Sequence, residues 1–195
     1  RDAALELASI NDVRPQAPHN VANALAASAL ARSYGVHPSA VRGGLHDFQP
    51  APHRIAEVGD FSGVRYVDDS KATNTHAAKT SLLAFSSVVW VAGGIAKGQE
   101  FDELVVEIHD RLRGVVLMGR DAEVIRDALG RHARDIPVIV VKRNDTSVMG
   151  EVVDTAARLA RPGDVVLLAP GCASWDMFTD YTERGRAFAE AVLRQ

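Results

Sequence analysis

The sequence predicts an α/β fold in which a mostly parallel sheet is flanked by helices. After residue 54, short apolar segments of strand-like composition alternate with longer segments of helical periodicity. Several of the apolar segments contain no polar residue, which is typical of strands that are covered on both faces. Glycine-rich or polar segments follow these strands, at the end where open parallel sheets bind their ligands.

The first fifty residues predict helices rather than strands. Residues 20–33 carry apolar side chains at helical spacing and many alanines, so we expect a helix that ends near Gly35. A second, shorter helix is expected over residues 38–45, with Pro38 in its first turn. Residues 1–16 mix apolar residues with Asn, Asp and Pro and predict no element.

Two prolines separated by one residue, Pro50 and Pro52, mark an extended segment over residues 48–54. Because such segments often link domains, we expect a boundary here, with residues 1–50 before it and residues 51–195 after it. The chain starts with Arg1 rather than Met, which indicates a trimmed or partial chain.

The second part predicts a Rossmann-like sheet. Its expected strands are residues 54–58, 64–67, 88–92, 114–117, 138–141 and 165–168. Its expected helices are the segment after Asn74 and residues 101–112, 122–129, 147–159 and 176–193. The first two strands, joined by residues 59–63, are expected to form a hairpin at one edge of the sheet, and the other strands are expected to be parallel.

Charge and composition exclude several classes of function. The formal net charge is −3, which does not suit binding to nucleic acid or to an anionic membrane. No apolar run is long enough to span a bilayer and no signal-peptide pattern is present, so a cytoplasmic location is expected. Cys172 is the only cysteine, which excludes an internal disulfide, and the seven histidines lack the spacing of a metal site.

Residues 68–74, at the end of a predicted strand, hold two carboxylates, an ammonium group and two hydroxyls. The following helix would place free backbone N–H groups beside them, so a charged or phosphorylated ligand would fit here. The alternative is that these residues only form a turn and cap the helix, since Asp, Ser, Thr and Asn are preferred in both roles. The segment alone does not decide between the two interpretations.

Lys97 lies in the segment 93–98, which follows the next apolar strand and begins with two glycines. The glycines would let the backbone approach a ligand. The segment lacks the spacing of a dinucleotide loop or a phosphate loop, so a glycine turn with a solvated lysine is the alternative. Residues 118–121 are interpreted as a turn in which Asp121 caps the next helix.

A fourth segment, residues 169–178, follows the last strand. Ser174 and Asp176 are expected to begin a helix whose N-terminus faces an anion. Cys172 has no neighbouring base, so we expect a packed thiol rather than a nucleophile, and Ser174 lacks the G-x-S-x-G pattern of hydrolases. Together the four segments predict a site for a small anionic ligand and leave its chemistry open.

Five short motifs, in this order along nearly the whole chain, resemble the Mur ligase family. They are His19-Asn20-x-x-Asn23-Ala24, Pro52-His53-Arg54, Asp69-Ser70-Lys71-Ala72-Thr73-Asn74, Gly93-Gly94-x-x-Lys97-Gly98, and Cys172-Ala173-Ser174-x-Asp176-x-Phe178 with Arg184-Gly185 behind it. Within the family, residues 70–73 are similar to the D-glutamate-adding ligases. Other peptidoglycan ligases and the folylpolyglutamate synthases usually carry a different pattern there.

The resemblance implies an ATP-dependent amide ligase of peptidoglycan synthesis. ATP would phosphorylate the terminal carboxylate of UDP-N-acetylmuramoyl-L-alanine, and the amine of D-glutamate would attack the acyl phosphate. Cations and Mg²⁺ would offset the charge on the phosphoryl oxygens.

The resemblance also implies roles for single residues. Asn23, Arg54 and Asp69 would contact ATP, with Asn23 near the base and Asp69 near the ribose. Lys71 would lie near the reacting phosphate and acyl groups as the catalytic residue. D-glutamate would be held through its two carboxylates by Thr73 and Lys97 and by Ser174 and Tyr181.

The sequence departs from the family pattern at three minor positions and in one major respect. Tyr181 replaces a Phe whose expected contact is through the backbone, Pro170-Gly171 replaces Pro-Ala, and the Asp that usually precedes Lys97 is absent. The major departure is that no G-x-x-x-x-G-K-S/T phosphate loop is present. In the family this loop, the Mg²⁺ ligands and a carbamylated lysine belong to an upstream central domain.

Residues 1–50 are therefore interpreted as the tail of that central ATPase domain, and residues 51–195 as the carboxy-terminal domain that binds D-glutamate. The central domain and an amino-terminal UDP-binding domain of the same protein would be its partners, no metal site is expected in this chain, and the chain alone is expected to be inactive. Two alternatives remain: a binding module for a nucleotide or an acidic amino acid without catalysis, and a paralogous ligase with another amino-acid substrate.

Overall fold

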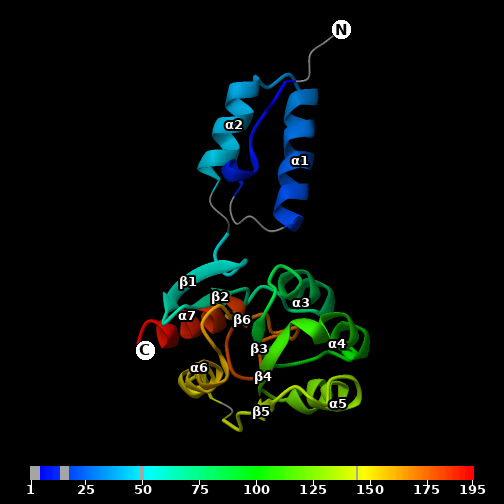
Figure 1. Ribbon diagram of the computed structural model, residues 1–195, viewed down its shortest axis with the longest axis vertical. Helices are drawn as coiled ribbons and strands as arrows, with labels where there is room; N and C mark the ends of the chain where they lie inside the picture. The colour runs from blue at the N-terminus through cyan, green and yellow to red at the C-terminus, as the bar shows by residue number, and fades with distance from the viewer. Residues whose placement is uncertain (1–4, 14–17, 49–50, 144) are drawn as a thin grey trace. The chain divides into compact units, whose positions relative to one another are not determined.

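A computed structural model describes residues 5–13, 18–48, 51–143 and 145–195. The chain divides into two compact units, Arg1–Ala51 and Pro52–Gln195, whose elements are labelled in Figure 1. The division falls inside the predicted linker, of which residues 49–50 lie outside the described part. The assignment of residues 1–50 to a larger ATPase domain stays a prediction.

The described residues of the first unit form the helices α1 (Pro18–Ser33) and α2 (Pro38–Asp47) and the short 3-10 helix η1 (Ile10–Asp12). Gly35 adopts a φ of +87°, which confirms its role in ending the first helix, and Pro38 begins the second as predicted. The η1 turn begins with a capping box, which was not predicted from the sequence. The Ser9 hydroxyl accepts a backbone N–H of the turn, and the Asp12 carboxylate accepts the backbone N–H of Ser9 at 2.8 Å.

The second unit contains a six-stranded sheet in the order β1-β2-β6-β3-β4-β5. Its strands are β1 (Ala56–Phe61), β2 (Val64–Asp68), β3 (Val88–Gly93), β4 (Leu112–Met118), β5 (Val138–Val140) and β6 (Val165–Leu168). Among the named strands of the described residues, β1 and β2 pair antiparallel and the other neighbouring strands pair parallel. The mostly parallel sheet with a hairpin at one edge is confirmed.

The hairpin turn is shorter than predicted. Strand β1 continues to Phe61, and the turn consists of Ser62 and Gly63, whose φ angles are +55° and +77°. Such angles fit the tight two-residue turns whose twist matches that of the strands. The register shifts between Glu57 and Gly59, so the glycine that suggested a turn marks an irregularity inside the strand.

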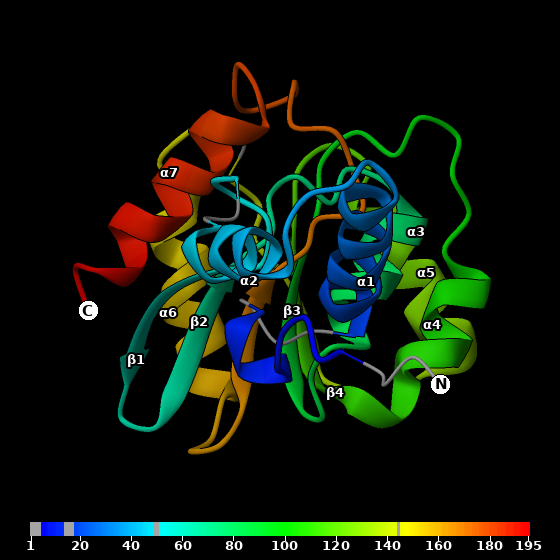
Figure 2. The same cartoon turned by 90° about the horizontal axis from the view of Figure 1, so that it is seen from above.

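Helices cover both faces of the sheet, as Figure 2 shows. On one side lie α3 (Thr75–Leu82), α4 (Asp102–Ile108) and α5 (Ala122–His132), and on the other lie α6 (Val148–Leu159) and α7 (Tyr181–Val192). The predicted helix over 101–112 is shorter, because residues 109–111 form the 3-10 helix η2 and Leu112 begins β4.

The apolar core lies on both sides of strand β3, whose residues are all buried. Trp90 faces the cluster with α3, α4 and α5, whereas Val89 and Val91 face the cluster with α6 and α7. The Trp90 indole N–H donates to the carbonyl of Ala169 at 2.7 Å, so its polar atom is satisfied inside the core. Strands β3 and β6, which lack polar residues, are covered on both faces as predicted, whereas the equally apolar β5 lies at an edge of the sheet and leaves Ile139 38% exposed.

Across the described residues, no helix has the length and apolar character that a bilayer crossing requires.

Candidate functional site

The sheet order brings three of the predicted loops together. Strand β6 lies between β2 and β3 and is parallel to both, so the loops that follow these strands meet at one edge. They are residues 69–74 after β2, 94–101 after β3 and 169–180 after β6, and they carry Lys71, Lys97 and Ser174 respectively.

Backbone hydrogen bonds join the three loops. The N–H of Gly171 donates to the carbonyl of Ala72 at 2.9 Å. Ile95 and Ala173 exchange two backbone bonds of 2.9 and 3.0 Å as an isolated antiparallel bridge. The loop after β6 is therefore bonded to both neighbours, and the site is a connected structure rather than three independent loops.

Gln99 adds a side-chain clamp to these bonds. Its Oε1 accepts the backbone N–H of Thr75 at 2.9 Å, and its Nε2 donates to the carbonyls of Ala96 at 2.8 Å and Gly171 at 3.3 Å. The Gln99 amide thus bonds its own loop after β3, the loop after β6, and the first residue of the helix that follows the loop after β2. Gln99 is an isolated glutamine in a loop, so no sequence pattern marks it as part of the site.

A buried arginine holds the loop after β2 against the loop after β6. Arg184 in α7 has no exposed surface, and it donates to Ser70 Oγ at 2.9 Å, to the Ser70 carbonyl at 2.8 Å and to the Cys172 carbonyl at 3.0 Å. Burial lowers the pKa of Arg184 to about 10. The sequence motif Arg184-Gly185 was part of the family resemblance, but it predicted no role for Arg184. The spacing of Arg184 to Phe188 and Ala191 places it on the buried face of the helix.

Cys172, beside this arginine, is fully buried, and burial raises the pKa of its thiol to about 12. The thiol is therefore protonated at neutral pH, which confirms a packed side chain rather than a nucleophile.

Asp69 is buried rather than open. It is 7% exposed, its Oδ2 accepts the hydroxyl of Ser81, and its backbone N–H donates to the carbonyl of Leu168 at 2.8 Å. Burial raises the pKa of Asp69 to about 6, against the opposing hydrogen bond from Ser81. Its contact with a ribose stays a prediction.

The start of the second unit is tied to the loop that carries Lys71. His53 Nδ1 lies 2.5 Å from Asp68 Oδ2, and the His53 carbonyl accepts the backbone N–H of Lys71 at 3.1 Å. His53 and Ile55 have φ angles of +62° and +49°, a conformation that non-glycine residues rarely adopt. Arg54, between them, is exposed and lies close enough to lower the pKa of Asp69 slightly.

Each predicted lysine faces an aromatic ring. Lys71 Nζ lies 3.9 Å from the ring centroid of Tyr181, and Lys97 Nζ lies 4.2 Å from that of Trp175. Neither ammonium group forms an ion pair with a carboxylate of the described residues. Tyr181 therefore contributes its ring, in addition to the backbone contact that was expected of it.

Two of the four predicted glutamate contacts, Thr73 and Ser174, differ in exposure. Thr73 is half-buried and its backbone N–H donates to the Lys71 carbonyl at 2.8 Å, whereas Ser174 is 2% exposed. Asn74 accepts the N–H of Ala77 at 2.8 Å, so the capping interpretation holds for this residue. The loop therefore caps a helix, and the contacts of Thr73 and Ser174 with D-glutamate stay predictions.

The helix N-terminus predicted at Ser174 and Asp176 is wrong. Helix α7 begins at Tyr181, and its cap is Asp180, whose Oδ1 accepts the N–H of Glu183 at 2.8 Å. Residues 174–180 form turns, and Asp176 Oδ2 accepts the N–H of Arg120 at 2.8 Å. The carboxylate at 176 therefore joins two loops and does not open a helix.

The cap predicted for Asp121 is also wrong. This carboxylate makes no bond to its own helix, and its Oδ2 instead accepts the N–H of Ala96 at 2.8 Å, which holds the pKa of Asp121 below its usual value. Gly93 and Gly94 serve close approach of backbone, since a side chain there would overlap the carbonyls of Met118 and Ala173. They make room for neighbouring loops rather than directly for a ligand.

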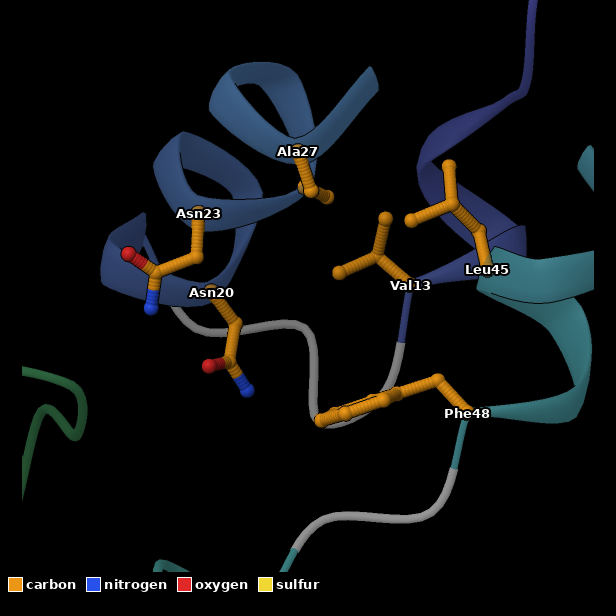
Figure 3. Close-up of a pocket in the computed structure, with 7 residues that line it drawn as sticks. Val13, Asn20, Asn23, Ala27, Leu45 and Phe48 are labelled. Carbon is orange, nitrogen blue, oxygen red and sulfur yellow. The ribbon is translucent and has the colours of Figure 1, made fainter. Parts of the chain in front are cut away.

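In the first unit, Asn23 lines a pocket of about 150 Å³. Figure 3 shows the amide side chains of Asn20 and Asn23 projecting from α1, with the Phe48 ring near Asn20 and with Val13 and Leu45 at the apolar end. Amide groups beside an apolar floor suit a nucleobase, whose edge is polar and whose faces are not. The contact of Asn23 with ATP stays a prediction.

Comparison with known proteins decides the family. Residues 53–172, more than half of the chain, match the family described as Mur ligase, glutamate ligase domain. The chain belongs to the Mur ligase family. Among its relatives are the UDP-N-acetylmuramoylalanine–D-glutamate ligases of Streptomyces coelicolor, 61% identical over 97% of this chain, and of Thermobifida fusca, 62% identical over 98%.

The chain spans about 40% of the length of these relatives. Solved structures of Mur ligases and of a related ligase share its fold. A UDP-N-acetylmuramate-alanine ligase from Thermotoga maritima matches 91% of this chain, and the match covers 38% of that protein, with a TM-score of 0.63 and 19% identity. A pseudomurein peptide ligase type C from Methanothermus fervidus matches 93%, covering 37% of that protein, with a TM-score of 0.62 and 16% identity.

Proposed function

We propose that this chain is the carboxy-terminal part of a ligase that joins D-glutamate to UDP-N-acetylmuramoyl-L-alanine at the expense of ATP, in the synthesis of peptidoglycan. Residues 51–195 supply the D-glutamate pocket, and residues 1–50 are the tail of the central ATPase domain. The observation that carries the proposal is the meeting of Thr73, Lys97 and Ser174 on three loops that hydrogen bonds join at one edge of the sheet. The names of the Streptomyces and Thermobifida relatives support the same substrate.

In the proposed pocket, D-glutamate is held through its two carboxylates. The Lys97 ammonium and the Thr73 hydroxyl bind one, and Ser174 and Tyr181 bind the other. The first carboxylate thus meets one charged and one neutral donor and the second meets two neutral donors, and each carboxylate accepts up to four hydrogen bonds. Asn23, Arg54 and Asp69 contact ATP.

The proposed reaction has two steps. A carboxylate oxygen of UDP-N-acetylmuramoyl-L-alanine takes the γ-phosphoryl group of ATP, and ADP leaves. The amine of D-glutamate then attacks the carbonyl carbon, phosphate leaves with the electron pair of the broken C–O bond, and the nitrogen loses a proton. Lys71 lies beside the reacting groups and stabilises the negative charge that develops on their oxygens.

The residues present fit only part of the machinery. The pocket at Asn23 suits a nucleobase, but no group of three or more His, Cys, Asp and Glu side chains suited to a metal ion occurs in the described ranges. We therefore assign the Mg²⁺ ligands to the upstream domains, together with the phosphate loop that is absent from the 195-residue sequence. This chain alone is expected to be inactive, and the whole protein is expected to act in the cytoplasm, where ATP is available.

The test is phosphate release by the full-length protein, with Lys71→Ala and the exposed Lys142→Ala as matched variants. Release should require both UDP-N-acetylmuramoyl-L-alanine and D-glutamate, and Lys71→Ala should lower kcat while leaving the unfolding midpoint near that of Lys142→Ala. Use of another amino acid in place of D-glutamate would identify a paralogous ligase. Binding of ATP and D-glutamate without phosphate release would identify a binding module, and D-glutamate-dependent release by the 195-residue chain would refute its inactivity.

A further inference from the structure

The two lysines of the proposed site share an arrangement that neither the family match nor the motifs describe. Lys97 faces the ring of Trp175, and Lys71 faces the ring of Tyr181. Both rings belong to residues 174–181, the segment that begins with Ser174 and ends at Tyr181, the first residue of α7. One segment therefore supplies an aromatic partner to each cation of the site.

The backbone around Lys97 is fixed, so its side chain is the variable part. The residue before it donates its N–H to Asp121 at 2.8 Å, and Ile95 forms the two-bond bridge with Ala173. Lys97 itself has a φ of +55°, an unfavourable value for a lysine that its surroundings must impose. A lysine side chain on such a fixed base still has many rotamers, and a contact is needed to select one.

Trp175 is the contact that makes this selection. It is 65% exposed, which is unusual for a tryptophan, and it lies two residues along the chain from the same bridge. The ring face attracts the ammonium group through its quadrupole, and it accepts no conventional hydrogen bond from it. The three N–H donors of Lys97 therefore stay available for a carboxylate, whereas an Asp or Glu partner would occupy them and cancel the charge.

Tyr181 is held in place more firmly. Its carbonyl accepts the hydroxyl of Ser70 at 2.7 Å, and its ring meets that of His53 edge-on, with centroids 6.4 Å apart. Ser70, the residue before Lys71, is also held by the buried Arg184, so the Tyr181 ring has a fixed position relative to Ser70. The ring thus determines where the Lys71 ammonium group lies.

We propose that Trp175 and Tyr181 are positioning residues, which orient the ammonium groups of Lys97 and Lys71 toward D-glutamate and toward the reacting acyl phosphate. This inference rests on the proposed function and adds to it the side chain of Trp175 and a role for the ring of Tyr181, whose proposed contact with D-glutamate is through the backbone. The two rings are expected to affect different kinetic parameters. Loss of the Trp175 ring weakens the capture of D-glutamate, and loss of the Tyr181 ring slows the chemical step.

The first experiment measures the lysines directly in the full-length protein. Lysine is labelled with ¹³C at Cε, and Lys71→Arg and Lys97→Arg assign the two signals. A methylene group above a ring is shifted upfield by its ring current. The Lys97 signal should be shifted upfield in wild type and in Trp175→Phe, and this shift should be lost in Trp175→Leu. The Lys71 signal should likewise be shifted upfield in wild type and in Tyr181→Phe and should lose the shift in Tyr181→Leu.

The second experiment is kinetic. Trp175→Leu should raise the KM for D-glutamate about two- to fivefold with little change in kcat, as expected for an exposed cation–π contact. Tyr181→Leu should lower kcat by a larger factor, about five- to thirtyfold, because its contact is partly shielded from water. Both Phe variants should restore most of the loss, and Tyr34→Leu, at a tyrosine that is 90% exposed in the first unit, serves as the control.

The outcomes separate the two proposals. Wild-type protein that uses D-glutamate, combined with Leu variants of unchanged kinetics or unshifted lysine signals, overturns the positioning role and leaves the proposed function intact. Wild-type protein that does not use D-glutamate overturns the proposed function, and the role of Trp175 with it. Lost ring-current shifts together with the divided KM and kcat effects support the inference.

Discussion

Replacement of Arg184 tests whether hydrogen bonds from a buried cation hold the site together. Two variants remove different parts of it. Arg184→Met keeps a long side chain and removes both charge and donors, whereas Arg184→Lys keeps the charge and has a single nitrogen for three acceptors. Arg186→Met, at an exposed position of the same helix, is the control.

The magnitude follows from two opposing effects. Arg184 donates three charge-assisted hydrogen bonds, worth about 1.5–3 kcal/mol each. Against this, burial lowers its pKa from 12.5 to about 10, so the charged form is disfavoured in the fold by about 3 kcal/mol. Removing both leaves a net loss of about 3 kcal/mol for Arg184→Met.

The order of the variants is the sharper part of the prediction. Arg184→Lys retains the cost of a buried charge and loses the bonds to at least one carbonyl, so it should be as destabilising as Arg184→Met or more so, about 4 kcal/mol. Substitution of the exposed Arg186 should change stability by less than about 0.5 kcal/mol.

Urea unfolding measures these differences. The fluorescence of the buried Trp90 reports on the second unit, and a Trp175→Phe background removes the signal of the exposed tryptophan. Equal m-values across the variants are required for a comparison of free energies. If Arg184→Met is as stable as the Arg186→Met control, the three hydrogen bonds contribute nothing net and the reasoning is refuted.

Three further predictions concern buried groups near the site. Asp69 has a pKa raised to about 6, above its unfolded value near 3.8, so its contribution to stability is fully present below pH 3.8 and is lost as the pH rises through 6; urea unfolding should show Asp69→Asn gaining about 2 kcal/mol on wild type between pH 4 and pH 7, and parallel pH profiles would contradict this. Gly185→Ala places a methyl group 2.7 Å from Asp68 Oδ2 and against His53, so it should lower the unfolding free energy by about 1–3 kcal/mol, while the control Gly150→Ala, with open space around it, should raise it by about 0.5–1 kcal/mol; two variants of equal sign would refute the packing argument. Cys172, whose thiol pKa is raised to about 12 by burial, should react with a thiol reagent only in denaturant, and rapid labelling of the native chain would show an accessible thiol.

The sequence predicted the strands well because their signal is local. Residues 88–92 and 165–168 are apolar without interruption, and the structure buries both segments on two faces. The start of α7 was misplaced because Ser174 and Asp176, which are residue types that commonly cap helices, come soon after the last strand. The local capping pattern of Asp180 and Glu183, which the sequence also contains, determines the actual start.

The geometry of the site was less accessible, because it depends on the order of the strands. Nothing in residues 64–93 indicates that β6, formed by residues 165–168, lies between β2 and β3. The motifs nevertheless selected loops that meet. The contacts of Gln99, Arg184 and Trp175 with these loops bridge residues distant in sequence or depend on turn geometry, so no periodicity reports them.

The central claim is that residues 51–195 carry a pocket for D-glutamate. The most direct measurement is a titration of the ¹⁵N-labelled chain with D-glutamate, followed by amide NMR signals, with L-glutamate and Lys97→Met as controls. We predict saturable shifts of Thr73, Lys97, Ser174 and Tyr181 with D-glutamate, much weaker shifts with L-glutamate, and their loss in Lys97→Met. Shifts that are absent from these residues, or equal for the two enantiomers, would contradict the claim.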